Sequence, residues 1–214
     1  MKSKFKYITE EFKNFNLPTW EGMPDIDLYM DQVVTYLDRE LKNLKVTNDD
    51  KLLTTSMINN YVKGDLLPPP TQKKYNKEHL SKLLIISSIK QILSISSISE
   101  LLNLYTSQNS KALYEFFINE QKNAINLEAN KLIDDINALS EKSEEETINE
   151  VLTYVIRLAL HAEVQKILAD KLLNVITSSI EMQKESEEIA RIVQQKEEKE
   201  KAKQTKKKVN EEVK

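Results

Sequence analysis

The sequence predicts a mostly α-helical protein, and three observations on the 214-residue chain support this fold class. Apolar side chains recur every three or four residues through most of the sequence, which is the period of an amphipathic helix. Only two glycines and five prolines are present. The last proline is Pro70, so nothing beyond that residue forces a break in a helix.

Composition excludes several classes of protein. The chain has no run of 18 apolar residues that could cross a membrane, and its first residues lack the apolar stretch of a signal peptide. It has no cysteine, which excludes disulfides and thiolate metal sites. We therefore expect a cytoplasmic protein with no membrane segment.

The first half of the chain divides into an arm and three helices. Residues 1–22 are predicted to be an arm with a few anchoring aromatic side chains. A short helix is expected to begin with a threonine cap, Thr54 or Thr55, and to end at Gly64, where the left-handed conformation is least costly. The 3.6-residue period predicts two longer helices, Asp27–Leu41 and Glu78–Leu93.

The second half is predicted to be helical almost throughout. A capping box at Ser97–Glu100 predicts a helix start, and the polar run Thr106–Ser110 is the predicted domain boundary. From Ile125 to Leu139 a 4-3-4-3 apolar spacing predicts a narrow seam that packs on another helix. Thr147–Ile180 is apolar around most of its circumference, which is typical of a central bundle helix or an oligomer interface. We expect self-association there; a monomeric helical hairpin that buries its own seam is the alternative.

The order of parts between Thr54 and Tyr75 is the one that a winged helix-turn-helix requires. A short helix with a polar face is followed by a glycine, a rigid extended corner at Pro68–Pro70 and a small basic loop. In a helix-turn-helix the second helix enters the major groove of DNA. A wing beside it contacts the phosphate backbone.

Nine side chains of this region are predicted to contact DNA. Asparagine can pair bidentately with adenine, hydroxyls bond to base edges or phosphates, and lysines neutralise phosphates. The alternative for the two asparagines is a merely exposed position, and for Tyr75 it is packing in the core. The predicted helix contacts are Thr55, Ser56, Asn59, Asn60 and Lys63, and the predicted wing contacts are Lys73, Lys74, Tyr75 and Lys77.

The charge distribution agrees with one focused nucleic-acid contact. The whole chain carries a formal charge of −3, but Ser56–Lys82 has five lysines against two acidic residues. Leu101–Ile180 has seven basic residues against twelve acidic ones. A basic patch beside an acidic helical region favours local binding to DNA, with chance clustering in a lysine-rich chain as the alternative.

Catalysis has few candidate groups. The two histidines, His79 and His161, lie in different predicted domains, and no cysteine is present to act with either. Adjacent carboxylates such as Asp134 and Asp135 do not share a helix face, so they lack the geometry of an acid–base pair. There is no glycine-rich phosphate loop. We predict no enzymatic activity, no metal site and no cofactor.

Residues Met57–Pro69 and Lys73–Ile86 resemble the winged helix of MerR-type regulators. Tyr61 matches the second tyrosine of that family's recognition helix, Lys73 its wing arginine and Tyr75 its wing tyrosine. The chain departs from the family pattern in four ways. It has two asparagines in place of the arginine and the first tyrosine, a shorter wing, no glycine before the fourth helix, and a much longer turn between the first two helices. The resemblance implies a winged helix-turn-helix.

A closer resemblance is to a bacterial family described only as domain of unknown function 1836. It covers roughly residues 17–105 and implies the same fold without an established activity. The residues that carry it are Trp20, Asp27–Gln32, Met57–Lys63, Lys74–Tyr75, His79–Leu80 and Lys90–Gln91.

The sequence therefore favours a sequence-specific transcriptional regulator that binds double-stranded DNA as a homodimer. An unknown effector or protein partner at the C-terminal helices remains open. The alternative is a protein-interaction module with the winged helix as scaffold. A membrane-surface helix over 147–193 is disfavoured by mixed charge on its polar side. The four predicted regions are an arm (1–22), a winged helix-turn-helix domain (23–106), a helical hairpin or bundle for self-association or regulation (107–195) and a charged, disordered tail (196–214).

Overall fold

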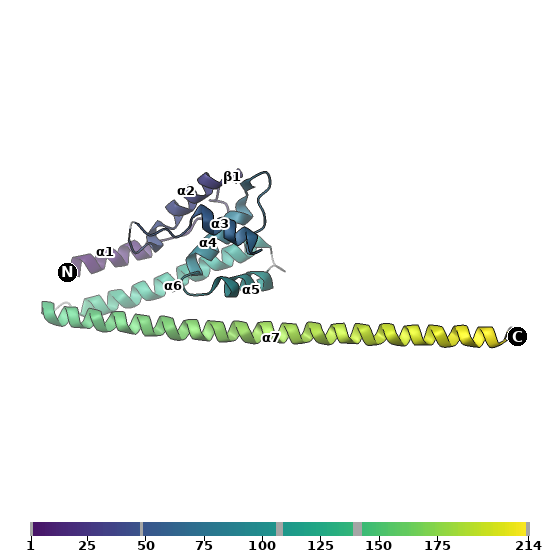
Figure 1. Cartoon of the computed structure of the whole chain (residues 1–214). Helices are drawn as coiled ribbons and strands as arrows, with labels where there is room; N and C mark the ends of the chain where they lie inside the picture. Colours follow the sequence, from purple (N-terminus) through teal and green to yellow (C-terminus); the bar gives the residue numbers. More distant parts are fainter. Residues whose placement is uncertain (1, 48, 106–108, 139–142, 213–214) are drawn as a thin grey trace. The chain divides into compact units, whose positions relative to one another are not determined.

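The computed structural model describes residues 2–47, 49–105, 109–138 and 143–212. It confirms a mostly α fold, because the regular structure is helical apart from two strands of two residues each (Figure 1). The elements are α1 (Lys2–Lys13), β1 (Leu28–Tyr29), α2 (Met30–Glu40), the 3-10 helix η1 (Lys42–Leu44), α3 (Thr55–Lys63), β2 (Lys74–Tyr75), α4 (Lys77–Ile89), α5 (Ile95–Tyr105), α6 (Ser110–Ala138) and α7 (Glu144–Glu212).

The chain separates into two units, Met1–Lys166 and Ile167–Lys214. The first contains every element up to the start of α7, and the second is the remainder of that helix. Of the predicted boundary at Thr106–Ser110, residues 106–108 lie outside the described residues. Backbone helix is described as far as Glu212, which includes most of the segment predicted to be a tail.

Helix α4 lies at the centre of the core of the first unit. Its Leu80, Leu83, Leu84 and Ile86 are fully buried, and Ile85 is almost so. Helix α2 packs against it, and so does α6. A helix that is apolar around its circumference requires neighbours on every side. The composition of α4 therefore explains why both α2 and α6 pack against it.

The N-terminal segment completes the core. Helix α1 lies along α6 (Figure 1), and Phe15 and Met23 beyond it are buried. The Tyr114 hydroxyl of α6 donates a hydrogen bond of 2.7 Å to the carbonyl of Pro18. The Trp20 ring lies 6.4 Å from the Tyr114 ring, centroid to centroid. Of residues 1–22, which we expected to be an arm, the described residues 2–22 thus form a helix and a core segment.

Most of the predicted seam of α6 is buried inside the same chain. Ile125, Ala129 and Ile136 are nearly inaccessible to solvent, Leu132 is half-buried, and Leu139 lies outside the described residues. Helix α1 covers part of this seam. Tyr154, near the start of α7, interacts electrostatically with charged α6 side chains.

We predict that Tyr114→Phe destabilises the protein by about 0.5–1.5 kcal/mol, because the partly buried hydrogen bond to the Pro18 carbonyl is lost. Urea unfolding followed by circular dichroism measures the change. Tyr7→Phe is the control, since Tyr7 is 66% exposed and the same loss of a hydroxyl there should cost almost nothing. Equal stability of the two variants would contradict a structural role for the Tyr114 hydroxyl.

Candidate nucleic-acid interface

Helix α3 is held firmly at its N-terminus. The Thr54 hydroxyl accepts a hydrogen bond from the Met57 amide at 3.2 Å, which confirms Thr54 as the N-cap. The Lys90 ammonium donates to the carbonyl of Leu52, just before the cap, and lies 3.4 Å from the Met57 sulfur. Burial lowers the pKa of Lys90. A lysine from the end of α4 thus fixes where α3 begins.

Helix α3 ends at the predicted place, with Gly64 as its C-cap, but the left-handed residue is not the predicted one. Gly64 has φ −93°, and the left-handed residue is Asp65 at φ 56°. The amides of Asp65 and Leu66 bond back to the carbonyls of Val62 and Tyr61, which is the Schellman pattern. This pattern puts the left-handed residue one position beyond the cap, and aspartate tolerates that conformation better than most residues. The predicted left-handed Gly64 is therefore wrong.

The polar face predicted for α3 is exposed. At 100° per residue, its five predicted contacts fall within an arc of about 140°. All five are exposed, whereas Ile58 and Tyr61 on the opposite side are buried. No acidic residue interrupts α3. The exposed set is Thr55, Ser56, Asn59, Asn60 and Lys63.

A tight turn follows the proline corner. Thr71 bridges Lys74, and the Lys74 amide donates to the Thr71 carbonyl at 2.9 Å. Both central residues have positive φ, 51° at Gln72 and 63° at Lys73. This geometry belongs to the two-residue hairpin turn that ordinarily has Asn-Gly at its centre. Each non-glycine residue there costs about 1 kcal/mol, so the turn holds an exposed lysine in a strained backbone.

The hairpin is joined to the body by strand pairing. Leu28 pairs with Tyr75, and Tyr29 with Lys74, in an antiparallel ladder. The Lys74 ammonium lies 5.2 Å from the centre of the Tyr29 ring, a cation–π contact.

The remaining predicted wing residues are less available. Tyr75 is only 3% exposed, so the structure places it in the core. Lys77 forms an ion pair with Asp25. Lys73 forms no ion pair with the described residues, and neither does Lys63 on α3. Among the described residues, Lys73 and Lys63 are therefore the site lysines best placed to meet an anion.

His79 connects the hairpin to α4. Its amide donates to the Asn76 side chain at 3.1 Å, and its Nδ1 accepts from the Asn76 amide at 3.2 Å, forming a reciprocal cap. The ring meets Tyr75 edge-on at 5.4 Å between centroids. Its Nε2 is buried without a hydrogen-bond partner of good geometry among the described residues. Burial lowers the pKa of His79, outweighing the nearby Pro68 and Pro69 carbonyls, which favour a proton.

The α3 face and the hairpin turn share one anchor. Leu66 and Leu67, between them, are buried, and both amides bond to the carbonyl of Tyr61 on α3. The chain between Lys63 and Thr71 can span at most about 28 Å. The structure therefore anchors the two predicted contact surfaces to the same core through Leu66 and Leu67.

Sequence reasoning missed the residues that support these surfaces. Lys90 and Asp25 are distant in sequence from the groups they bind, so no local pattern reveals them. The strain at Gln72 was also missed. The only sequence feature that points to a tight turn there is the position of Thr71–Lys74 between the rigid proline corner and strand β2.

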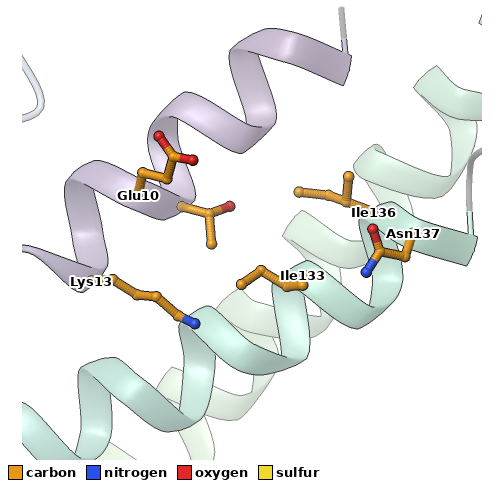
Figure 2. A pocket seen from close by; sticks show the side chains of 6 residues that line it. Glu10, Lys13, Ile133, Ile136 and Asn137 are labelled. Carbon is orange, nitrogen blue, oxygen red and sulfur yellow. The ribbon is translucent and has the colours of Figure 1, made fainter.

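A pocket of about 260 Å³ lies between α1 and α6 (Figure 2). Figure 2 shows Glu10 and Lys13 on the α1 side and Ile133, Ile136 and Asn137 on the α6 side. The Thr9 hydroxyl, which also lines it, already donates to the Phe5 carbonyl at 2.8 Å. Its two isoleucines and scattered polar groups form no catalytic arrangement, and we assign it no function.

No three histidine, aspartate or glutamate side chains in the described ranges are arranged to hold a metal ion. No helix in the described part of the chain is long and apolar enough to cross a membrane. The absence of enzymatic activity and of a cofactor stays a prediction.

Comparison with known families identifies one domain. Residues 18–117 match the model of a family described as domain of unknown function DUF1836. The chain contains a DUF1836 domain. This confirms the family predicted from the sequence, and the match extends beyond the predicted limit into the start of α6. Helix α7 lies wholly outside the DUF1836 match. No curated protein and no solved structure matches the chain.

We predict that Lys73→Gly stabilises the DUF1836 domain by about 1 kcal/mol, because glycine adopts a φ of 63° without steric cost. Urea unfolding at neutral pH measures the gain. Lys73→Ala is the matched control, since it removes the charge and keeps the β-carbon. A gain of the same size with alanine would mean that charge, and not backbone strain, is relieved at this turn.

We predict that stability falls below about pH 6.5 because of His79. Its pKa is lowered in the folded state, so the unfolded chain binds the proton more readily. The stabilisation is fully present above the unfolded pKa and is lost as the pH falls toward the lowered value. His79→Gln can keep the reciprocal cap without titrating, so urea midpoints between pH 5 and 7 should become flatter. His161→Gln, at an exposed position on α7, should keep the parent slope.

Proposed function

We propose that this protein is a transcriptional regulator that binds double-stranded DNA through a winged helix-turn-helix formed by α2, α3 and the 71–75 hairpin. The observation that carries the proposal is the pairing of an acid-free polar helix face with a strained turn that exposes a lysine. Strained backbone persists only where the surrounding structure imposes it, and such positions cluster at functional sites.

Helix α3 has the features of a groove-reading helix. It packs on α2 through its apolar side and presents Asn59 and Asn60 outward. An asparagine side-chain amide can donate to adenine N7 and accept from the adenine N6 amine, so it can discriminate among bases in the major groove. The cap at Thr54 leaves the first turn of α3 exposed at Thr55 and Ser56, where hydroxyls can reach DNA.

The hairpin supplies backbone contacts in this proposal. Lys73 at the turn binds phosphate directly, and Lys74 contributes charge from its place over the Tyr29 ring. Buried Tyr75 and ion-paired Lys77 support the hairpin, and Lys63 extends the phosphate contacts from α3. Regulators of this kind act as dimers, because one small domain alone gives limited affinity and specificity.

The second candidate function is a protein-interaction module. It is favoured by the apolar side chains that α7 exposes within the first unit, among them Leu152 at 56%, Ile156 at 61% and Val164 at 62%. Patches of this kind mark protein interfaces. An interface formed by these α7 side chains would leave the polar face of α3 without a role. DNA binding accounts for that face, so we place DNA binding first.

The deciding experiment is capture of sheared genomic DNA from the host by the full chain at 50 and 200 mM salt. We expect a few enriched fragments. Three lysine–phosphate contacts would lower affinity about 40-fold between these salts. Lys73→Glu/Lys74→Glu should lose capture of all sequences, whereas Asn59→Ala should change which fragments are preferred.

Lys122→Glu/Lys131→Glu on α6 is the control, because it changes the net charge equally at exposed positions away from the proposed surface. Loss of capture in this control to the same degree would show nonspecific attraction. No enrichment at either salt, from protein shown to be folded, would refute DNA binding and favour the interaction module.

A further inference from the structure

An apolar seam with a heptad period runs along the second unit. From Leu168 to Val193 eight residues follow one 4-3-4-3 spacing without interruption, the spacing that keeps one helix face toward a partner helix. Six of the eight are large and apolar, and each of these is at least half exposed. The α7 seam is defined as Leu168, Leu172, Val175, Ser179, Met182, Ser186, Ile189 and Val193.

No neighbour inside this unit covers the α7 seam. Helix α7 is the only element described between Ile167 and Lys214. The exposed fractions along the seam reach 64% at Val175 and 70% at Met182. A single helix cannot bury its own apolar stripe, so the seam needs a second helix to remove it from water.

We propose that the α7 seam binds the same seam of a second copy of this chain, in antiparallel orientation. A two-fold axis passing between Ile180 and Glu181 generates the pairing. This surface is independent of DNA binding, because it uses none of the residues of α3 or the hairpin.

The proposed axis aligns every seam position with a seam position of the second copy. Each seam residue of one copy faces one seam residue of the other copy, and we call such a pair a layer. There are eight layers, of which four are distinct, because the two-fold axis generates each kind of pair twice. The distinct layers place Leu168 against Val193, Leu172 against Ile189, Val175 against Ser186 and Ser179 against Met182.

The two serines decide between orientations. In the antiparallel arrangement each serine meets a large apolar side chain, Val175 or Met182, so small and large residues alternate across the seam. A parallel arrangement in register would place Ser179 against Ser179 and Ser186 against Ser186. Two layers would then lack apolar contact, and the voids would weaken the interface. The Ser179 hydroxyl already donates to the Val175 carbonyl at 2.7 Å, so it needs no polar partner across the seam.

Charge favours the same orientation. Glu185 flanks the seam directly, at the position before Ser186. A parallel pair in register would keep the two Glu185 residues at the same level along the helices. The antiparallel axis separates Glu185 from the second Glu185 by about 13 Å along the helix, at a rise of 1.5 Å per residue. Separations beyond the Debye length of about 8 Å are largely screened at physiological salt.

The size of the surface sets the expected strength. Seam and flanking positions over these four heptads amount to about 16 residues a side, somewhat below the roughly 20–30 of a standard interface. We therefore expect an association that is visible at micromolar concentrations and reverses on dilution.

Sedimentation equilibrium of the full chain between about 1 and 100 µM tests the pairing, without DNA. We expect a monomer–dimer equilibrium. Leu172→Glu should weaken it by at least about tenfold, because a carboxylate is buried against Ile189 in two layers. Asn174→Glu adds the same charge two residues away on the outer side of α7 and should associate like the parent. A monomer throughout the range, or equal behaviour of the two variants, would overturn the proposal.

Disulfide trapping tests the orientation, and the absence of native cysteine makes it unambiguous. Leu168→Cys and Val193→Cys are made separately, with tags of different mass, and oxidised alone and mixed. The antiparallel axis predicts the mixed disulfide and little of either homodimer. Homodimeric disulfides of each variant, without the mixed species, would overturn the antiparallel register.

Discussion

The burial of α4 is the constraint on which the first unit depends. Its leucines and isoleucines face every direction, and fully burying each contributes about 1.5–3 kcal/mol. Helices α2 and α6 pack against α4, and its two ends carry the polar contacts that position the candidate interface. At the N-terminal end, Asn76 and His79 cap the helix and meet the hairpin. At the other end, Lys90 reaches the start of α3. One apolar helix thus sets the positions of both candidate DNA-binding surfaces.

This arrangement explains how the strained turn persists. Pairing of Leu28 with Tyr75, burial of Tyr75 and the cap at Asn76 all act on residues immediately after Lys73. Together they hold the turn in a conformation that Gln72 and Lys73 would not adopt alone. The local cost is small beside the apolar burial of the core. The structure can therefore keep a lysine where glycine would be more stable.

Periodicity in the sequence was enough to predict most of the helices, though not α1, and the outward face of α3, because burial follows the 3.6-residue period directly. It also revealed the seam of α6, but not that α1 would cover it, since the partner of a seam depends on tertiary packing. The end of α3 was predicted correctly at Gly64, but the left-handed conformation was assigned to this glycine and belongs to the neighbouring Asp65. Tyr75 illustrates the limit of motif reasoning. A tyrosine between lysines suits a phosphate contact, yet its place in a strand paired with Leu28 directs it into the core.

The strained turn also has an evolutionary consequence. Stability and charge are opposed at Lys73, where glycine would relax the backbone and remove the lysine, but not at the uncharged Gln72. Natural proteins rarely reach their stability optimum, because selection removes only changes that fall below a threshold. A cost of about 1 kcal/mol at Lys73 is therefore tolerable without any compensating function. Position 72 is the one at which the turn can evolve toward lower strain and still keep its charge.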